Sequence, residues 1–164
     1  MINPDPERYT DEGPLGAGGM GEVRRVRDTR LDRVLAMKCI RGKLIDDEAS
    51  RARFRREARL TAQLEHPGII PVHEVGELAD GRLFYTMPVV QGRTLGDAIA
   101  EVHDAMDGGT WRPASSGWTF RRLVEAFRRV CDAVAYAHAR RVVHGDIKPD
   151  NIMLGAHGEV FVLD

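Results

Sequence analysis

The chain has 164 residues, of which 43% are hydrophobic and 30% are charged, with a formal net charge of −1. This size and balance predict a soluble globular domain with a sizeable core. The near-neutral charge argues against non-specific nucleic-acid binding, and no apolar run approaches the roughly 20 residues of a membrane span. Cys39 and Cys131 lie far apart in apolar segments, which favours buried free thiols and a cytoplasmic location over a disulfide.

The first half of the chain has patterns typical of β-strands, interrupted by one helix. The run "VLAMKCI" at 34–40 is apolar except for one lysine, and "VHEVGEL" and "LFYTMPVV" flank a turn signal at 79–81. The helix is predicted over about 47–64, with Phe54 and Ala58 on its apolar side. It ends before "HPG", where proline and glycine stop it.

The second half is mainly helical. A sustained apolar stripe at three- and four-residue spacing predicts a helix over 120–139, formed by Phe120, Leu123, Val124, Phe127, Val130, Cys131, Val134 and His138. A loop at 103–117 precedes it, and a hairpin that turns at 155–158 follows it. The fold class is therefore α+β, with a mainly β lobe at 9–90 and a mainly α lobe at 91–164.

The stretch "LGAGGMGEV" at 15–23 is rich in glycine. Alone, this pattern fits a plain hairpin turn as well as a phosphate-binding loop. A dinucleotide-binding fold needs a helix directly after the glycines, but "EVRRVRD" reads as a strand. The remaining interpretation is a glycine hairpin whose bare backbone can approach phosphate groups.

Two further features carry charge into apolar surroundings. Lys38 lies within a predicted buried strand, which is costly unless the lysine is paired, and Glu57 on the helix is a natural partner. An edge-strand lysine and a surface glutamate are the plainer alternatives. The stretch "VVHGDIKPDNIML" places Asp146, Lys148 and Asn151 in a stiff loop between apolar runs, a common way to hold catalytic groups.

Together these features resemble the signature set of the protein kinases, in the same order: the glycine loop, "AMK", Glu57, "HGDIKPDN" and the terminal "VLD". The segments "HPGIIPVHEVGEL" and "VCDAVAYAHARRVVH" are similar to those of bacterial serine/threonine protein kinases. The resemblance runs from Tyr9 to Asp164 and implies a two-lobe kinase fold. It also implies an incomplete kinase domain, since the activation segment and most of the helical lobe would follow Asp164.

The resemblance implies a role for each polar residue in phosphoryl transfer, which depends on positioning and charge stabilisation. Lys38 would hold the α- and β-phosphates of ATP and Glu57 would fix Lys38. Asp146 would accept the proton of a protein serine or threonine hydroxyl, and Lys148 would neutralise the γ-phosphate. Mg²⁺ would be bound by Asn151 and Asp164. The nucleotide would further contact Leu15, Gly16, Ala17, Gly18, Gly19, Met20, Gly21, Val23, Ala36, Met87, Pro88, Val90 and Met153.

Two departures keep other functions open. Gly145 replaces the arginine usual between the histidine and aspartate of this loop, and "HGD" also occurs in small-molecule phosphotransferases. Because the resemblance ends at Asp164, before the activation segment, an inactive nucleotide-binding or regulatory kinase remnant is an alternative function. We also expect part of the stripe at 120–139 to face water, which would favour self-association.

Overall fold

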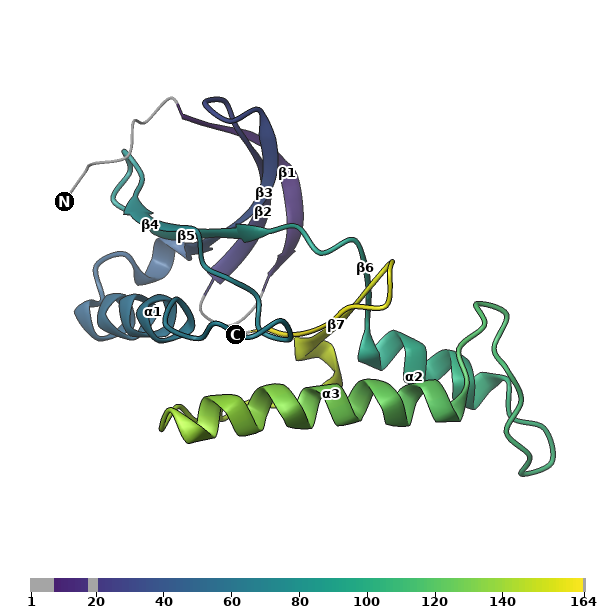
Figure 1. Ribbon diagram of the computed structural model, residues 1–164. Coiled ribbons are helices and arrows are strands. Elements are labelled where there is room, and N and C mark those ends of the chain that lie inside the picture. Colours follow the sequence, from purple (N-terminus) through teal and green to yellow (C-terminus); the bar gives the residue numbers. More distant parts are fainter. Residues whose placement is uncertain (1–7, 18–20, 164) are drawn as a thin grey trace. The chain divides into compact units, whose positions relative to one another are not determined.

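The computed structural model describes residues 8–17 and 21–163 (Figure 1). The chain divides into two compact units, Met1–Leu64 with Pro71–Val89 and Glu65–Ile70 with Val90–Asp164. The predicted α+β class, with a β-rich unit that carries one main helix, is confirmed. The sequence predicts residues 65–70 in the mainly β lobe, whereas in the structure they belong to the second unit. The reason is that Ile69 bridges Val162, whose N–H donates to the Gly68 carbonyl at 2.8 Å.

The first unit is an antiparallel sheet with one long helix. Its elements are β1 (Tyr9–Ala17), β2 (Gly21–Asp28), β3 (Arg33–Ile40), the 3₁₀-helix η1 (Gly42–Leu44), α1 (Glu48–Thr61), β4 (Glu74–Glu77) and β5 (Leu83–Pro88). The strand order is β1-β2-β3-β5-β4. The sheet is strongly curved, and α1 lies on its outer side next to β5 (Figure 1).

Each face of this sheet has its own core. Leu35, Met37 and Cys39 of β3 point to one face, where they pack with Val26 and Phe84. The alternate β3 side chains point to the face that carries α1, as the side-chain period of a strand requires. Because β3 is central and covered on both faces, nearly all of its residues are buried, which explains its continuous apolar sequence.

Helix α1 forms close to where the sequence predicts it. Asp47 caps it, since the carboxylate of Asp47 accepts the N–H groups of Ala49 and Ser50 at 3.3 and 3.2 Å. Phe54 and Ala58 are its fully buried residues, and the rest of its surface is rich in arginine. The apolar anchoring of α1 therefore rests on very few side chains.

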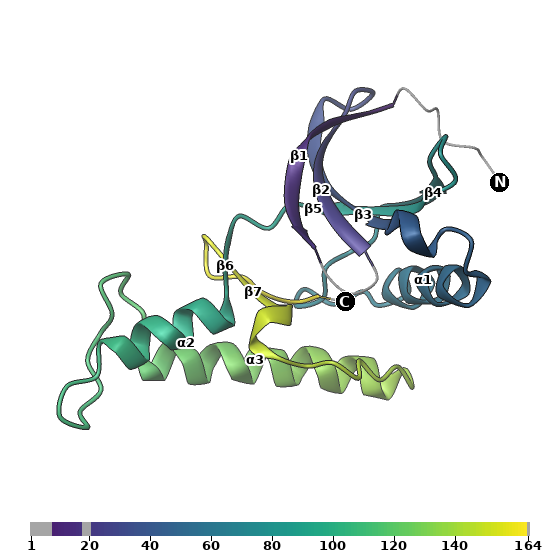
Figure 2. The ribbon, with the colours of Figure 1, turned by 180° about the vertical axis from the view of Figure 1, so that it is seen from behind.

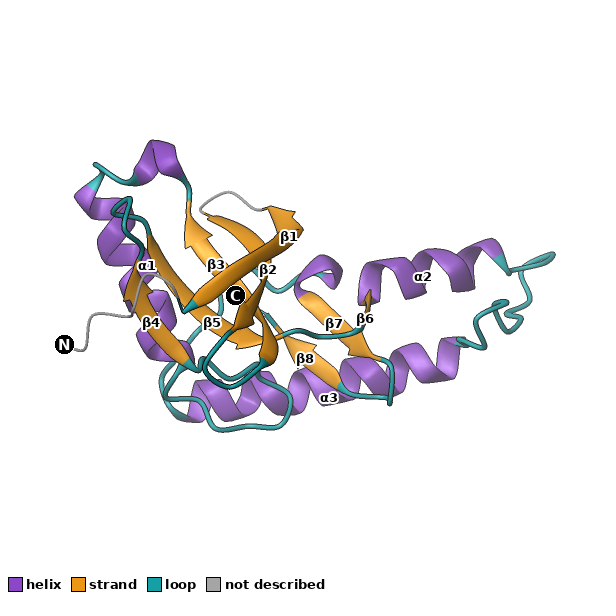
Figure 3. Cartoon of the chain, turned by 90° about the horizontal axis from the view of Figure 1, so that it is seen from above, coloured by secondary structure: helices purple, strands orange, loops and turns teal. Residues whose placement is uncertain are grey.

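The second unit combines two helices with a small sheet. Its elements are β6 (Gly92–Thr94), α2 (Leu95–Asp104), α3 (Phe120–Ala139), the 3₁₀-helix η2 (Pro149–Asn151), β7 (Ile152–Gly155) and β8 (Val160–Val162). Figure 2 shows α2 and α3 side by side. The sheet has the order β6-β7-β8, and β8 packs on α3 (Figure 3). The predicted terminal hairpin is confirmed, with a left-handed glycine at Gly158 (φ 90°).

Helix α3 has the predicted bounds, but its buried face differs from the stripe of large side chains. The residues buried on it are Ala126, Val130, Ala133 and Ala137, small enough for close approach of the neighbouring elements. Phe120, Val124 and Phe127 are 49%, 51% and 59% exposed, as expected for part of the stripe. Cys131 is also exposed, so the expectation of two buried thiols holds only for Cys39. In the described part of the chain, no helix is long and apolar enough to cross a membrane.

Candidate active site

The glycine-rich stretch forms the predicted hairpin between β1 and β2, in which Gly16 pairs with Val23 and Ala17 with Glu22. Gly21 begins β2 under a steric constraint: a Cβ there would lie 2.7 Å from the carbonyl oxygen of Cys39. Only glycine allows this close approach of β2 and β3. Gly18, Gly19 and Met20 lie outside the described residues.

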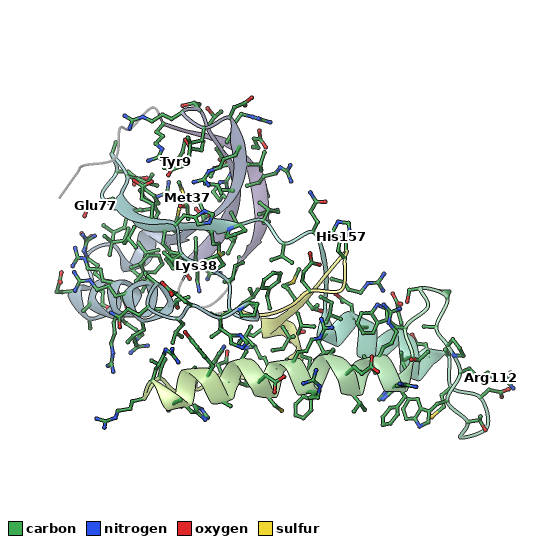
Figure 4. All side chains as sticks on the ribbon, viewed as in Figure 1. Tyr9, Met37, Lys38, Glu77, Arg112 and His157 are labelled. Atoms are coloured by element: carbon green, nitrogen blue, oxygen red, sulfur yellow. The ribbon has the colours of Figure 1, made fainter. Side chains whose placement is uncertain are left out.

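Lys38 and Glu57 form the predicted ion pair, with the Lys38 Nζ 2.9 Å from Oε1 of Glu57. The lysine side chain is only 9% exposed. Figure 4 shows Lys38 on the α1 side of the sheet, whereas Met37 lies on the opposite side. This burial excludes the plainer alternative of a solvent-facing edge lysine, because β3 is a central strand.

The predicted nucleotide contacts of the first unit gather on the same face of the sheet as Lys38. Val23 is the cross-strand partner of Lys38 on β2, and Met87 is the partner of Ala36 on β5. Directly paired residues of antiparallel strands share a face, and residues two apart on one strand do so as well. Apolar side chains therefore lie beside Lys38, with Ala36 and Met87 buried and Val23 half-buried. The binding of an adenine ring next to its phosphates requires such an apolar neighbour of the ammonium.

Four further predicted nucleotide contacts are divided between the two units. Leu15 is 46% exposed and lies within a register shift of the β1–β2 pair. Pro88 ends β5 and Val90 follows in the connection to β6, both half-buried. Met153 is in β7 of the second unit, paired with Thr94 and Phe161.

In the second unit, the loop after α3 brings Asp146, Lys148 and Asn151 together on one carboxylate. Lys148 Nζ donates to Oδ2 of Asp146 at 2.7 Å, and Nδ2 of Asn151 donates to the same oxygen at 3.0 Å. Nδ2 of Asn151 also donates to the Asp146 backbone carbonyl at 2.8 Å. The short helix η2, which begins at Pro149, turns the chain so that Asn151 faces back to Asp146.

The electrostatics of this group suit a general base that stays ionised. The Lys148 ammonium, followed by the Asn151 amide, holds the pKa of Asp146 below its ordinary value of 3.8. Asp146 remains 64% exposed and Lys148 47%, so both are open to a reactant. A carboxylate that is ionised, accessible and held by two donors can accept a proton from a hydroxyl group.

His144 connects this loop to Leu163. One ring nitrogen, Nε2, lies 2.7 Å from the Leu163 carbonyl, and Nδ1 accepts the Asp146 N–H at 3.2 Å. The Leu163 N–H in turn donates to the Asn151 carbonyl at 2.9 Å. Both backbone groups of Leu163, the residue before Asp164, are thus hydrogen-bonded. Asp164 itself lies outside the described residues.

The polar groups present fit a hard cation such as Mg²⁺. Because Nδ2 of Asn151 is used by Asp146, the side-chain carbonyl oxygen of Asn151 is the atom suited to a metal. Among the described residues, histidine, cysteine, aspartate and glutamate form no cluster of three that would make a separate metal site. Two Mg²⁺ ligands are predicted, Asn151 and Asp164. Of these, Asn151 is among the described residues, and its side-chain oxygen is suitable for the metal.

Two features of the first unit were missed from the sequence. Tyr85 of β5 donates its hydroxyl to Oε1 of Glu57 at 2.8 Å, but it lies in a run that reads as plain apolar strand. A cavity of about 200 Å³ lies on the other face of the first unit's sheet, lined in part by Met37, Cys39 and Tyr9. None of the predicted site residues that the structure describes lines that cavity, which lies on the face opposite Lys38.

A family model described as "Protein kinase domain" matches residues 9–164. The chain is a member of the protein kinase family. It is 41% identical over 150 residues to the serine/threonine-protein kinase PknD of Protochlamydia amoebophila, covering 92% of this chain and 15% of that protein. It is 39% identical over 160 residues to PknD of Chlamydia felis, covering 96% of this chain and 17% of the relative.

Solved kinase structures agree with the fold. The crystal structure of the Mycobacterium tuberculosis PknI kinase domain matches with a TM-score of 0.71 and 28% identity, covering 96% of this chain and 59% of that one. This kinase-family chain thus spans about one sixth of the length of the curated PknD relatives. Its relatives are serine/threonine kinases, and the family in general uses ATP and Mg²⁺.

Proposed function

We propose that this chain acts in the transfer of the γ-phosphate of ATP to a serine or threonine hydroxyl of a protein. The observation that supports this most is the convergence of Lys148 and Asn151 on one carboxylate oxygen of Asp146. A kinase remnant without catalytic function has no need of such an arrangement. The identity to serine/threonine kinases over more than nine tenths of the chain favours a protein acceptor over a small molecule.

In the proposed reaction, the substrate hydroxyl oxygen forms a bond to the γ-phosphorus while the bond to the oxygen bridging the β- and γ-phosphates breaks, and ADP leaves. Asp146 takes the hydroxyl proton, and Lys148 offsets charge on the transferring group. Lys38, fixed by Glu57, orients the α- and β-phosphates. Mg²⁺ would be held by Asn151 and Asp164, and it would supply further charge neutralisation at the phosphates.

Location and partners follow from this reaction. Because it consumes ATP, we place the chain in the cytoplasm, with ATP and a protein substrate as its partners. The exposed side chains of Phe120, Val124 and Phe127 form an apolar surface on α3 that suits self-association between copies of the chain.

The test measures two quantities on the same protein: binding of Mg-ATP by calorimetry, and transfer of labelled γ-phosphate to a serine- and threonine-containing peptide library. We expect binding that Lys38→Met weakens about tenfold or more, and transfer that Asp146→Asn abolishes without loss of binding. Binding with no transfer by the wild-type chain would identify a regulatory nucleotide-binding protein. The same transfer assay is repeated with aminoglycosides and choline as acceptors, and transfer to these but to no peptide would identify a small-molecule kinase.

A further inference from the structure

Glu57 accepts two hydrogen bonds at a single carboxylate oxygen. Oε1 of Glu57 receives the Lys38 ammonium at 2.9 Å and the Tyr85 hydroxyl at 2.8 Å. Tyr85 is 4% exposed and is the direct cross-strand partner of Lys38 on β5. The Lys38 Nζ also lies 5.8 Å from the centroid of the Tyr85 ring, within the range of a cation–π contact. The three side chains form one compact group in the first unit.

The ring and the hydroxyl of Tyr85 make different contacts with α1. The ring packs on Phe54 with centroids 5.3 Å apart, one helical turn from Glu57. Phenylalanine would make this apolar contact equally well, so the contact does not explain a tyrosine. A buried hydroxyl is costly unless it has a partner, and here that partner is the carboxylate that also holds Lys38.

The Tyr85 hydroxyl contacts α1, a helix that few apolar contacts fix to the sheet. Phe54 and Ala58 are its only fully buried residues, and its exposed surface is arginine-rich. Lysine and glutamate both have long flexible side chains, and forming an ion pair between them costs rotamer entropy. Tyrosine has two main torsions and is already held in the core, so it fixes the Glu57 carboxylate with little further ordering.

We propose that Tyr85 is a positioning residue that holds Glu57 against the sheet, so that the Lys38–Glu57 pair is formed before nucleotide binds. The proposal rests on the proposed role of Lys38 as a phosphate ligand. Tyr85 touches no substrate; it acts on the phosphates through Glu57 and Lys38. It also gives Glu57 of α1 a second strand partner besides Lys38.

The test uses Tyr85→Phe, which removes the hydroxyl and keeps the ring. The matched control is Tyr9→Phe, which removes another tyrosine–glutamate hydrogen bond of the same sheet, that of Tyr9 with Glu74. Tyr9 lies on the opposite side of the sheet from Lys38 (Figure 4). In the nucleotide-free protein, we expect amide hydrogen exchange in α1 to become about tenfold faster in Tyr85→Phe, relative to β3 amides, and to stay unchanged in Tyr9→Phe.

A second measurement separates positioning from a general structural effect. Because Lys38 acts on phosphates, Tyr85→Phe should weaken ATP binding about three- to tenfold and leave adenosine binding unchanged. In a Lys38→Met background, the same change should cause no further loss of ATP affinity. Equal losses for ATP and adenosine, or a full additional loss in the Lys38→Met background, would overturn the positioning role.

The exchange measurement does not depend on the proposed function. If the wild-type chain bound neither ATP nor adenosine, the proposed function would fail, while faster exchange in α1 of Tyr85→Phe would still support the hold of Tyr85 on Glu57. Unchanged exchange in α1 would overturn the inference even if ATP binds and phosphate is transferred.

Discussion

His144 and Leu163 are joined by a hydrogen bond in which Nε2–H of the imidazole donates to the backbone carbonyl, 2.7 Å away. The tautomer follows from the partners of the ring, because Nδ1 accepts the N–H of Asp146 and cannot carry a proton itself. A single ring therefore connects the backbone of the proposed base, Asp146, to Leu163, the residue before the proposed metal ligand Asp164.

The first prediction concerns this connection. His144→Ala removes both hydrogen bonds, so the Mg²⁺ dependence of ATP binding should shift to about tenfold higher Mg²⁺, as for other residues that support metal ligands. His103→Ala is the control for the loss of a histidine ring, because His103 lies near the end of α2, where its ring contacts Trp111. Calorimetric titration at several Mg²⁺ concentrations measures the shift. A Mg²⁺ dependence that is the same in both variants would refute the connection.

The second prediction concerns Gly145. Its backbone is left-handed, with φ of 83°, and a Cβ added there would meet no atom within 4 Å. The cost of a side chain is therefore backbone strain alone, and Gly145→Ala should lower the free energy of unfolding by about 1 kcal/mol. Gly42→Ala is the control, because its Cβ also meets nothing within 4 Å and its φ is not positive. Urea denaturation of both variants measures the difference, and equal stability would contradict the strain.

These two residues show where sequence reasoning reaches its limit. The motif "HGD" identifies the loop. It does not predict the hydrogen bond of His144 to Leu163, because Leu163 follows β8, which only the fold brings close to His144. In the sequence, the absence of the usual arginine at 145 is a departure from the kinase pattern, and the structure adds a backbone reason for glycine there. Loop geometry of this kind leaves no periodic signal in the sequence.

Helix α3 shows a second limit. Its bounds could be predicted because apolar spacing persists over many turns, but the choice of buried face could not. The apolar periodicity points to the large side chains of Phe120 and Phe127 as the buried face. In the structure these side chains are exposed, and the small Ala126 and Ala133 are buried because they allow close packing. Tyr85 was missed for a related reason, since its pairing with Lys38 depends on the register of β3 and β5.

The third prediction concerns the pH dependence of the proposed base. The Lys148 ammonium lowers the pKa of Asp146 below 3.8, so Asp146 stays ionised at neutral pH and loses its charge only in stronger acid. Lys148→Met should therefore move the midpoint of the Asp146 titration upward, towards 3.8. Carboxyl-carbon NMR titration measures both proteins. The N-cap Asp47, whose pKa is lowered mainly by its bond with Ser50, should not change in the same spectra. An unchanged Asp146 midpoint would contradict the role of Lys148.

The fourth prediction concerns the apolar surface of α3. Phe127 is 59% exposed, so Phe127→Asp should reduce self-association without destabilising the fold. Arg128→Gln, next along the same helix and outside the apolar surface, lowers the net charge by the same single unit and is the control for the change in charge. Sedimentation velocity over a range of concentrations gives the monomer fraction. The surface is not the contact between copies if both variants associate as the wild-type chain does.

The fifth prediction concerns the buried carboxylate of Asp28 in the first unit. Its side chain is 0% exposed and is held by Arg8, with Nη2 of Arg8 2.9 Å from Oδ2 and Nε 3.1 Å from Oδ1. The Arg30 N–H donates to the same carboxylate at 3.2 Å. Because the side chain is fully buried, loss of its charge leaves a neutral group against Arg8, which then has one carboxylate partner, Glu74 at 2.8 Å, in place of two. Asp28→Asn should therefore destabilise the fold by about 2–4 kcal/mol at neutral pH.

The pH dependence of this loss has a definite sign. The hydrogen bond from Arg8 lowers the pKa of Asp28 in the folded protein below the 3.8 of an ordinary aspartate. The unfolded chain therefore takes up the proton first as the pH falls. The stabilisation is complete above about pH 5 and is lost as the pH falls through 3.8 and then through the lower folded value. The difference in unfolding free energy between wild type and Asp28→Asn should accordingly shrink in acid, as urea denaturation at several pH values can measure. Asp11→Asn provides the contrast, because the Asp11 side chain is 49% exposed and pairs with Arg24 at the surface. The free energy of unfolding of Asp11→Asn should stay within about 1 kcal/mol of the wild-type value at any pH.

The contradicting outcomes concern the same free energies. Equal losses in Asp28→Asn and Asp11→Asn, or a loss in Asp28→Asn that persists unchanged in acid, would show that burial of the Arg8–Asp28 pair does not govern the acid stability of the sheet.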